Sequence, residues 1–331
     1  MTDPVIVEIT RGGIVESFHH GAIAVLDADG KVVLSRGDID RPIFPRSAIK
    51  GFQALPLIES GAADRFGLTD AQIAMACASH SGEPRHAETA AATLAKAGLD
   101  VRCLECGAHW PLGDKAARAL AATGAQPSAL HNNCSGKHAG FICVAVQEGH
   151  DPKGYVQPDH PLMREITGTL GAMTGYDLSN TARGVDGCSI PTFAIPLRNI
   201  AHGFARFATG QGLGPERAKA AARLRKAVAA EPFMVAGTDR FDTVVMEALR
   251  ERAFIKTGAE GVYCAALPEA GLGIALKVED GAGRAAETAM AALLKRFLTL
   301  TEAEAAVVGA RTDWPMKNWN GIEVGRMRAA V

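Results

Sequence analysis

The sequence predicts a mixed α/β (α+β) protein in which both ends of the chain build one antiparallel sheet around an inserted helical segment. Three observations predict this. Residues 5–35 have strand patterns, the stretch from about 69 to 250 is mostly helical in pattern, and strand patterns return after residue 261. We therefore predict a single domain over 1–331. Its sheet lobe covers about 1–45 and 250–331, and its helical lobe covers about 46–249.

The first 60 residues predict a hairpin followed by a short helix. Residues 22–26 and 32–34 are strand-like and flank Asp27-Ala28-Asp29-Gly30, a favourable hairpin turn. Pro45 lies two positions before Ser47 and permits a helix to start there. Pro56 limits or kinks that helix.

Amphipathic helical patterns follow one another through the middle of the chain. Thr69-Asp70 can cap the first of them. The others span 86–99, 137–148, 162–173, 197–208, 215–229 and a segment running from Thr238-Asp239 to about 249. A late hairpin follows over 261–266 and 273–278, and residues 287–298 predict a final helix.

Composition excludes several classes of function. The formal net charge of the 331 residues is −1, which offers no electrostatic attraction to nucleic acid or to an anionic membrane. No apolar run is long enough to span a bilayer. The N-terminus has no basic segment followed by an apolar stretch, so we expect a cytoplasmic protein without a signal peptide. Its seven cysteines are then expected to be reduced.

Two short motifs point to serine acyl-transfer chemistry. Residues 47–50 form an S-x-x-K sequence, and residues 256–258 form K-T-G. The S-x-x-K spacing places a hydroxyl and an amine one helical turn apart. In this order the two motifs are typical of serine β-lactamase and penicillin-binding-protein-like folds, whose sheet and helical regions meet at the active site. The S-x-x-K motif alone also fits a helix N-terminus with a solvated lysine.

The motifs predict two serine–lysine pairs. Ser47 is a candidate nucleophile that needs an adjacent base, and Lys50 supplies one if burial or a neighbouring cation lowers its pKa. Arg46 and Lys256 are candidate neighbouring cations. A second pair joins Ser79, from the polar sequence at 78–83, to Lys256. The alternative is that residues 78–83 are only a polar helix end stopped by Gly82.

Two further segments combine thiol, amine and carboxylate groups. Residues 131–138 and 186–191 contain Cys134 and Cys188, which can bind zinc together with a nitrogen of Lys137 or His138. Two buried reduced cysteines are the commoner alternative. Asp186 can instead hold a substrate ammonium. The Cys103-x-x-Cys106 sequence with His109 lacks a second ligand pair, which favours a structural role.

Five of these segments together resemble the bacterial class 3 L-asparaginases, the asparaginase II sequence family. They are residues 45–50, 78–83, 133–138, 186–189 and 256–261, in the same order, and the resemblance covers nearly the whole chain. It implies hydrolysis of L-asparagine to L-aspartate and ammonia, a serine β-lactamase-like fold and a homodimer. It assigns the catalytic pairs to Ser47 with Lys50 and Ser79 with Lys256. It assigns a zinc site to Cys134, Lys137 and Cys188.

We expect Asp186 to bind the substrate ammonium, with Arg46 and His138 as further substrate-binding candidates, and Ser47 to attack the side-chain amide. Either serine remains possible as the nucleophile. The alternative enzymes are a glutaminase or a β-lactamase-like esterase or peptidase, since one methylene changes specificity only modestly. A non-catalytic zinc-binding protein is an alternative of a different class.

Overall fold

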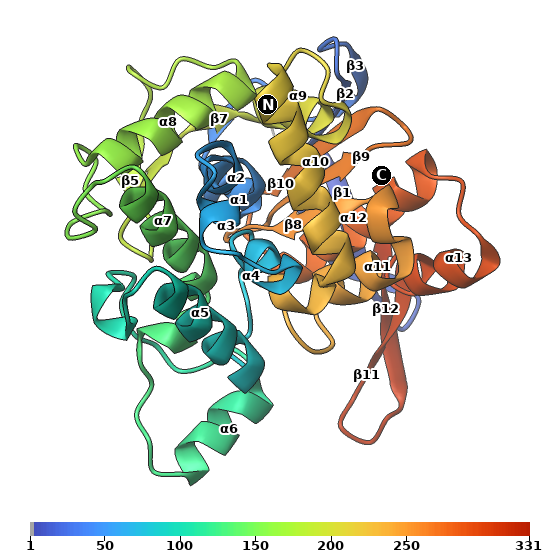
Figure 1. The fold of residues 1–331 in the computed structure, drawn as a ribbon. Coiled ribbons are helices and arrows are strands. Elements are labelled where there is room, and N and C mark those ends of the chain that lie inside the picture. The colour runs from blue at the N-terminus through green and yellow to red at the C-terminus, as the bar shows by residue number, and fades with distance from the viewer. Residues whose placement is uncertain (1–2) are drawn as a thin grey trace.

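Both ends of the chain contribute to one antiparallel sheet in the computed structural model, which describes residues 3–331. The strand order is β11-β12-β1-β2-β10-β9-β8, and β3 pairs with β2. The strands are β1 (Val5–Arg11), β2 (Ile14–Asp27), β3 (Val32–Arg36), β8 (Phe254–Thr257), β9 (Val262–Leu267), β10 (Leu272–Val278), β11 (Asp313–Lys317) and β12 (Glu323–Ala329). The predicted sheet built from both chain ends around a helical insertion is confirmed (Figure 1).

Helices fill the inserted segment and return at the C-terminal end. The α-helices are α1 (Lys50–Gln53), α2 (Leu55–Glu59), α3 (Ala62–Arg65), α4 (Asp70–Met75), α5 (Pro84–Lys96), α6 (Asp114–Ala122), α7 (Ser135–Gln147), α8 (Pro161–Thr174), α9 (Leu197–Thr209), α10 (Pro215–Ala230), α11 (Phe241–Leu249), α12 (Gly283–Phe297) and α13 (Glu302–Gly309). The 3₁₀ helices are η1 (Arg46–Ile49), η2 (Val101–Cys103), η3 (Ala129–His131), η4 (Pro232–Val235) and η5 (Arg250–Arg252). Two small pairings join β4 (Pro42–Ile43) to β7 (Ile195–Pro196) and β5 (Arg183–Val185) to β6 (Pro191–Phe193).

The central strands are covered on both faces. Every residue of β9 is buried, and so is every residue of β10 except Lys277, although successive side chains point to opposite faces of a sheet. Helix α9 packs against β2, β9 and β10, while α12 packs against β1, β9, β10 and β12. This explains why these strands lack the alternating polar pattern of a half-exposed sheet.

The segment around Ser47 folds differently from the single helix that its sequence predicts. It forms η1, α1 and α2 in succession, and Pro56 lies in the first turn of α2, where a missing N–H costs nothing. The helix expected to open at Thr238-Asp239 begins at Phe241 instead. Thr69 caps α4 through a capping box, as expected.

The strand β8, which carries the K-T-G sequence, lies at one end of the strand order beside η1 and α11. The loop after α4 runs into the same region, where backbone bonds tie Ser79 to Val235 and Ser81 to Ala236. Three segments that are distant in sequence, η1, the loop after α4 and β8, therefore meet beside the edge of the sheet.

Candidate active site

Two lysines hold the hydroxyl of Ser79 between them. The ammonium Nζ of Lys50 lies 2.9 Å from Ser79 Oγ, and Nζ of Lys256 lies 2.9 Å from the same oxygen. Lys50 comes from α1, Ser79 from the loop after α4, and Lys256 from β8. The three side chains are almost completely buried. The structure therefore brings together the expected Ser79–Lys256 pair and adds Lys50 to it.

Lys256 is poised to exchange a proton near neutral pH. Its side chain is fully buried, and burial is the main reason that its pKa is lowered to about 7; the charges of Lys50 and Arg240 contribute to this lowering. The charge of Asp242 acts in the opposite direction. A neutral Lys256 amine can accept the proton of the Ser79 hydroxyl, which makes this lysine a candidate general base.

Ser47 lies on η1 and is half-buried. Within residues 3–331 no hydrogen bond joins its hydroxyl to Lys50, although the two share one helical turn. The Lys50 ammonium instead reaches Ala78 O at 2.5 Å, Ser79 Oγ at 2.9 Å and Cys134 Sγ at 3.1 Å. These three acceptors match the three protons of an ammonium. Lys50 thus links the Ser79 site to the cysteine cluster.

The glycine of K-T-G is required by a close approach to the backbone before Ser47. A Cβ atom on Gly258 would lie 2.8 Å from Pro45 O and 3.1 Å from the Ala48 side chain. Both neighbours belong to the segment that carries Ser47, so the end of β8 can touch this segment only without a side chain. Gly258 of the K-T-G motif therefore allows the end of β8 to lie close to the segment that carries Ser47.

Arg46 and Asp186 form an ion pair beside Ser47. Nε and Nη2 of Arg46 donate to the same oxygen, Asp186 Oδ1, at 2.9 and 2.8 Å. Burial alone would raise the pKa of Asp186, but the bond from Arg46 and the charge of Lys137 outweigh it and lower that pKa. No described residue donates to Asp186 Oδ2, so one carboxylate oxygen is available to a ligand.

Cys134, Lys137 and Cys188 form a buried cluster next to this pair. Lys137 Nζ lies 3.1 Å from Cys188 Sγ, and both thiols are free. A hydrogen bond from Cys188, aided by the charges of Lys50 and Lys137, lowers the pKa of Cys134 well below that of an ordinary thiol. The same bond, together with burial, raises the pKa of Cys188. Of the two thiols, Cys134 is therefore the one that ionises more readily.

The donor chemistry of this cluster fits zinc. Two sulfurs and one amine supply three of the four positions of a tetrahedral site, and zinc accepts both donor types. Among residues 3–331 there is no group of three His, Cys, Asp or Glu side chains that could hold a metal. The zinc site therefore has a third donor only if Lys137 contributes its amine. The pKa of Lys137 is raised, so a metal ion would have to displace a proton from this lysine.

His138 and the C-x-x-C sequence lie outside this arrangement. His138 is completely buried, and its Nδ1 bonds to the Tyr155 hydroxyl at 2.6 Å. Its Nε2 has no partner among the described residues. His109 accepts a bond from Asn133 N at 3.0 Å and so supports the loop that leads to Cys134. Cys103 and Cys106 bond to backbone carbonyls of Asp100 and Ala129.

Sequence reasoning missed Asp242. This residue is fully buried on α11, where Oδ1 accepts the N–H of Thr257 at 2.9 Å and Oδ2 accepts the Tyr263 hydroxyl at 2.5 Å. It thereby anchors the strand that carries Lys256. Residues 241–249 are largely apolar with two acids, Asp242 and Glu247, and an acid in the first turn of a helix is ordinary, so the sequence carries no distinctive signal for this role.

A pair of stacked histidines was also missed. The rings of His80 and His86 are 4.8 Å apart, and His86 stacks on Phe233. Each Nδ1 accepts a backbone N–H, and each Nε2 faces an acceptor, Ser135 Oγ or Phe233 O. Burial lowers the pKa of both rings, so they are neutral. They hold the loop containing Ser79 against its neighbours.

Several solved structures are similar to this chain at low identity. A β-lactamase from Mycobacterium bovis is 15% identical, with a TM-score of 0.39, over 84% of this chain and 94% of that one. A D-alanine carboxypeptidase from Burkholderia cenocepacia is 11% identical, with a TM-score of 0.39, over 88% and 92%. A simvastatin synthase mutant from Aspergillus terreus is 14% identical, with a TM-score of 0.39, over 78% and 86%. Likenesses at this level carry no weight in the assignment.

The family match is more specific. No curated protein matches this chain in sequence. Among the described residues, no helix combines the length and the apolar character that crossing a membrane requires. The family model described as L-asparaginase II matches residues 7–329, and it therefore includes every site residue discussed above. The chain belongs to the L-asparaginase II family and is an amidohydrolase.

Proposed function

We propose that the protein is an L-asparaginase that hydrolyses L-asparagine to L-aspartate and ammonia through a serine-bound acyl intermediate. The observation that carries this proposal is the buried Ser79 hydroxyl, held at 2.9 Å by both Lys50 and Lys256. A hydroxyl between two amines can pass protons in either direction, as amide hydrolysis requires. The family match supports an amide as the substrate.

Substrate binding is assigned to Asp186 and Arg46. The free Oδ2 of Asp186 accepts the α-ammonium of asparagine, because charge-assisted bonds of this kind are the strong ones. Arg46 fixes the Asp186 carboxylate through Oδ1. Because Arg46 directly precedes Ser47, we also assign it contact with the substrate carboxylate. This arrangement directs the side-chain amide toward Ser47.

Ser47 is the proposed nucleophile, with the lysines as its proton acceptor. A neutral Lys256 takes the Ser79 proton, and Ser79 in turn takes a proton from Lys50, which leaves Lys50 neutral. Lys50 can then deprotonate Ser47 within the same helical turn. The first N–H groups of η1, including that of Ser47, are available to the developing oxyanion.

Ammonia leaves when the same relay returns its proton to the amide nitrogen. Cleavage of the C–N bond leaves an aspartyl ester on Ser47, and a water molecule then attacks this ester. The water loses its proton to the lysine network, and Ser47 regains its own as L-aspartate departs. The relay thus acts first as a base and then as an acid in each half of the reaction.

Zinc and assembly complete the proposal. Cys134, Lys137 and Cys188 would hold zinc, which supplies a fixed charge that orients neighbouring groups when bound. Cys134 also accepts a bond from Lys50, so the cluster controls the position of that lysine. The homodimer and the cytoplasmic location stay predictions.

The test compares ammonia release from L-asparagine and L-glutamine by the wild type, Ser47→Ala and Ser79→Ala. Ser35→Ala is the control, since Ser35 is exposed on β3. Release from asparagine that is lost in both site variants supports the proposal. Release from neither amide by folded, zinc-supplemented wild type would exclude an asparaginase and redirect attention to esters and peptides.

Single-turnover labelling identifies the nucleophile. Wild type quenched during a single turnover of radiolabelled L-asparagine should carry a covalent aspartyl adduct, and Ser47→Ala should carry none. An adduct that forms on Ser47→Ala would assign the attack to Ser79.

A further inference from the structure

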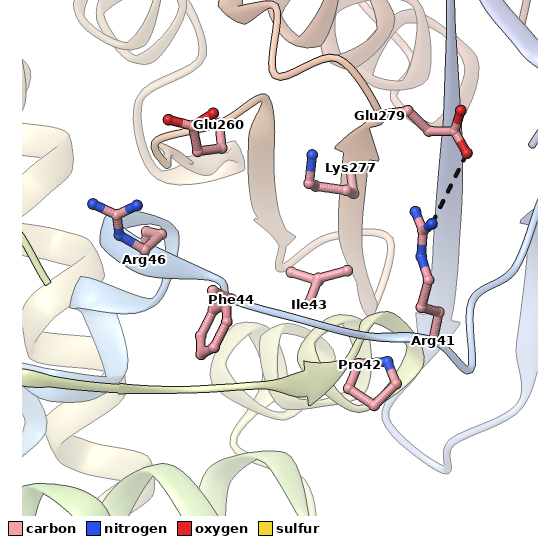
Figure 2. A pocket seen from close by; sticks show the side chains of 8 residues that line it. All are labelled: Arg41, Pro42, Ile43, Phe44, Arg46, Glu260, Lys277 and Glu279. Carbon is pink, nitrogen blue, oxygen red and sulfur yellow. Dashed lines mark ion pairs between the residues drawn. The ribbon is translucent and has the colours of Figure 1, made fainter. Parts of the chain in front are cut away.

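A cavity of about 430 Å³ lies next to the proposed active site and shares Arg46 with it (Figure 2). Its volume lies within the range of small-molecule sites. Ile43 and Phe44 form an apolar side, and Arg41, Lys277 and Glu260 bring charges to it from separate elements. It therefore combines an apolar surface with groups of both signs.

Lys277 and Glu260 face this cavity without pairing. Lys277 is half-buried on β10, and no ion pair within 4 Å includes it among residues 3–331. Its Nζ donates only to the Val278 carbonyl. Glu260 likewise has no ion pair or side-chain hydrogen bond among the described residues. Figure 2 shows the Lys277 amine directed between Glu260 with Arg46 on one side and Arg41 with Glu279 on the other.

The other charges around the cavity are already satisfied. Arg46 is paired with Asp186. Arg41 lies 3.2 Å from Asp3 and 3.9 Å from Glu279. Lys277 and Glu260 are therefore the two free groups of opposite sign. Burial and the charge of Arg41 lower the pKa of Lys277 despite the nearby carboxylates, so a ligand carboxylate would relieve an unfavourable environment.

The backbone also holds two of these residues in a costly conformation. Arg46 has φ +50° and Glu260 has φ +57°, in the left-handed region that favours glycine. Such residues persist where the surrounding structure fixes them, often beside a ligand. Both line the same cavity, Arg46 as the first residue of η1 and Glu260 in the turn between β8 and β9.

We propose that this cavity is a second binding site for a free α-amino acid with a small uncharged side chain. Lys277 binds the α-carboxylate, Glu260 binds the α-ammonium, and Ile43 with Phe44 receives the side chain. An amino acid carries both charges on neighbouring atoms, which matches one free cation and one free carboxylate that do not pair with each other. A simple anion would leave Glu260 unpaired.

Arg46 connects this site to the catalytic residues. Arg46 lines the cavity, its guanidinium bonds Asp186, and it is followed directly by Ser47. Arg46 alone therefore separates an occupant of the cavity from Asp186, the proposed ammonium-binding residue, and from Ser47, the proposed nucleophile. The inference does not depend on which amide the enzyme hydrolyses.

The test is calorimetric titration with L-2-aminobutyrate, which carries both charges and has no amide to hydrolyse. The proteins are the wild type, Lys277→Gln, Glu260→Gln and the control Lys317→Gln, whose lysine is exposed on β11. We expect Lys277→Gln and Glu260→Gln each to weaken binding by about tenfold or more, and Lys317→Gln to leave it unchanged. Butyrate and propylamine, each with one charge, should bind more weakly to the wild type.

Equal binding by the wild type and both cavity variants would overturn the proposal, and so would butyrate binding as tightly as the amino acid. Glu260 is exposed, so its variant is expected to fold even if Lys277→Gln does not. Ammonia release is measured on the same proteins. Inactive wild type with Lys277-dependent binding would refute only the asparaginase proposal, whereas active wild type without such binding would refute only the second site.

Discussion

Removing the Asp242 carboxylate tests whether this residue both anchors β8 and sets the protonation of Lys256. Asp242→Ala leaves two buried donors, the Thr257 N–H and the Tyr263 hydroxyl, without an acceptor. Each unsatisfied buried group costs about 1–3 kcal/mol, so we expect the free energy of unfolding to fall by about 4 kcal/mol. Asp242→Asn keeps an oxygen for Thr257 and can still meet Tyr263, so its loss should be nearer 1 kcal/mol.

Asp242→Asn also has a predicted effect on the pH profile. The charge of Asp242 raises the pKa of Lys256, which burial holds at about 7. Without that charge the pKa falls further, so the amine becomes neutral at lower pH. The acidic limb of kcat/KM for L-asparagine should therefore move below its wild-type position. Urea unfolding measures the stability, and ammonia release over a pH series measures the limb.

Tyr263→Phe is the matched control, because it removes one bond to Asp242 and keeps the charge near Lys256. It should reduce stability by about 1 kcal/mol and leave the acidic limb in place. An Asp242→Asn enzyme whose limb stays at the wild-type pH, or moves upward, would refute the argument. Such a result would mean that another group than Lys256 titrates in catalysis.

Three further outcomes are expected. Folding lowers the pKa of His80 and His86, so the unfolded chain binds more protons than the folded one below about pH 6.5. The free energy of unfolding should therefore fall below that pH by up to about 1.4 kcal/mol per pH unit for each ring. An equal free energy of unfolding in urea at pH 7 and pH 5 would contradict this. Gly273→Ala puts a Cβ 2.0–2.2 Å from the backbone of α9 and should cost about 3 kcal/mol or more, whereas a wild-type melting temperature would contradict that clash. Arg46→Lys removes one of the two hydrogen bonds that Arg46 donates to Asp186, so KM for L-asparagine should rise about tenfold with a smaller change in kcat. An unchanged KM with a large fall in kcat would instead indicate that Arg46 acts in the lysine network.

Local patterns predicted most of the fold. The early hairpin, the capped α4 and the late hairpin each follow from residues adjacent in sequence. The C-terminal strands β11 and β12 were not predicted, because Pro315 and Gly325 interrupt their strand patterns. Their place in the sheet depends on pairing with β1, a contact between opposite ends of the chain.

The sequence predicted which residues belong to the candidate site better than it predicted which of them contact one another. The S-x-x-K spacing indicates that Ser47 and Lys50 share a side of one turn, but Lys50 reaches Ser79 and Cys134 instead. Helical spacing specifies where a lysine starts and not where its four-carbon side chain ends. The Ser79–Lys256 contact was inferred from motif order, and Asp242 was missed because its role appears only when α11 lies beside β8.

Three buried lysines have a consequence for engineering this enzyme. Lys50, Lys137 and Lys256 each expose at most 1% of their surface, and removing an ion from water costs several kcal/mol even after relaxation. Variants selected only for heat resistance are therefore expected to accumulate apolar replacements at these positions, since these relieve that penalty while destroying turnover. Directed evolution of this scaffold has to score activity in every round, and thermostabilising changes are best confined to surfaces remote from β8.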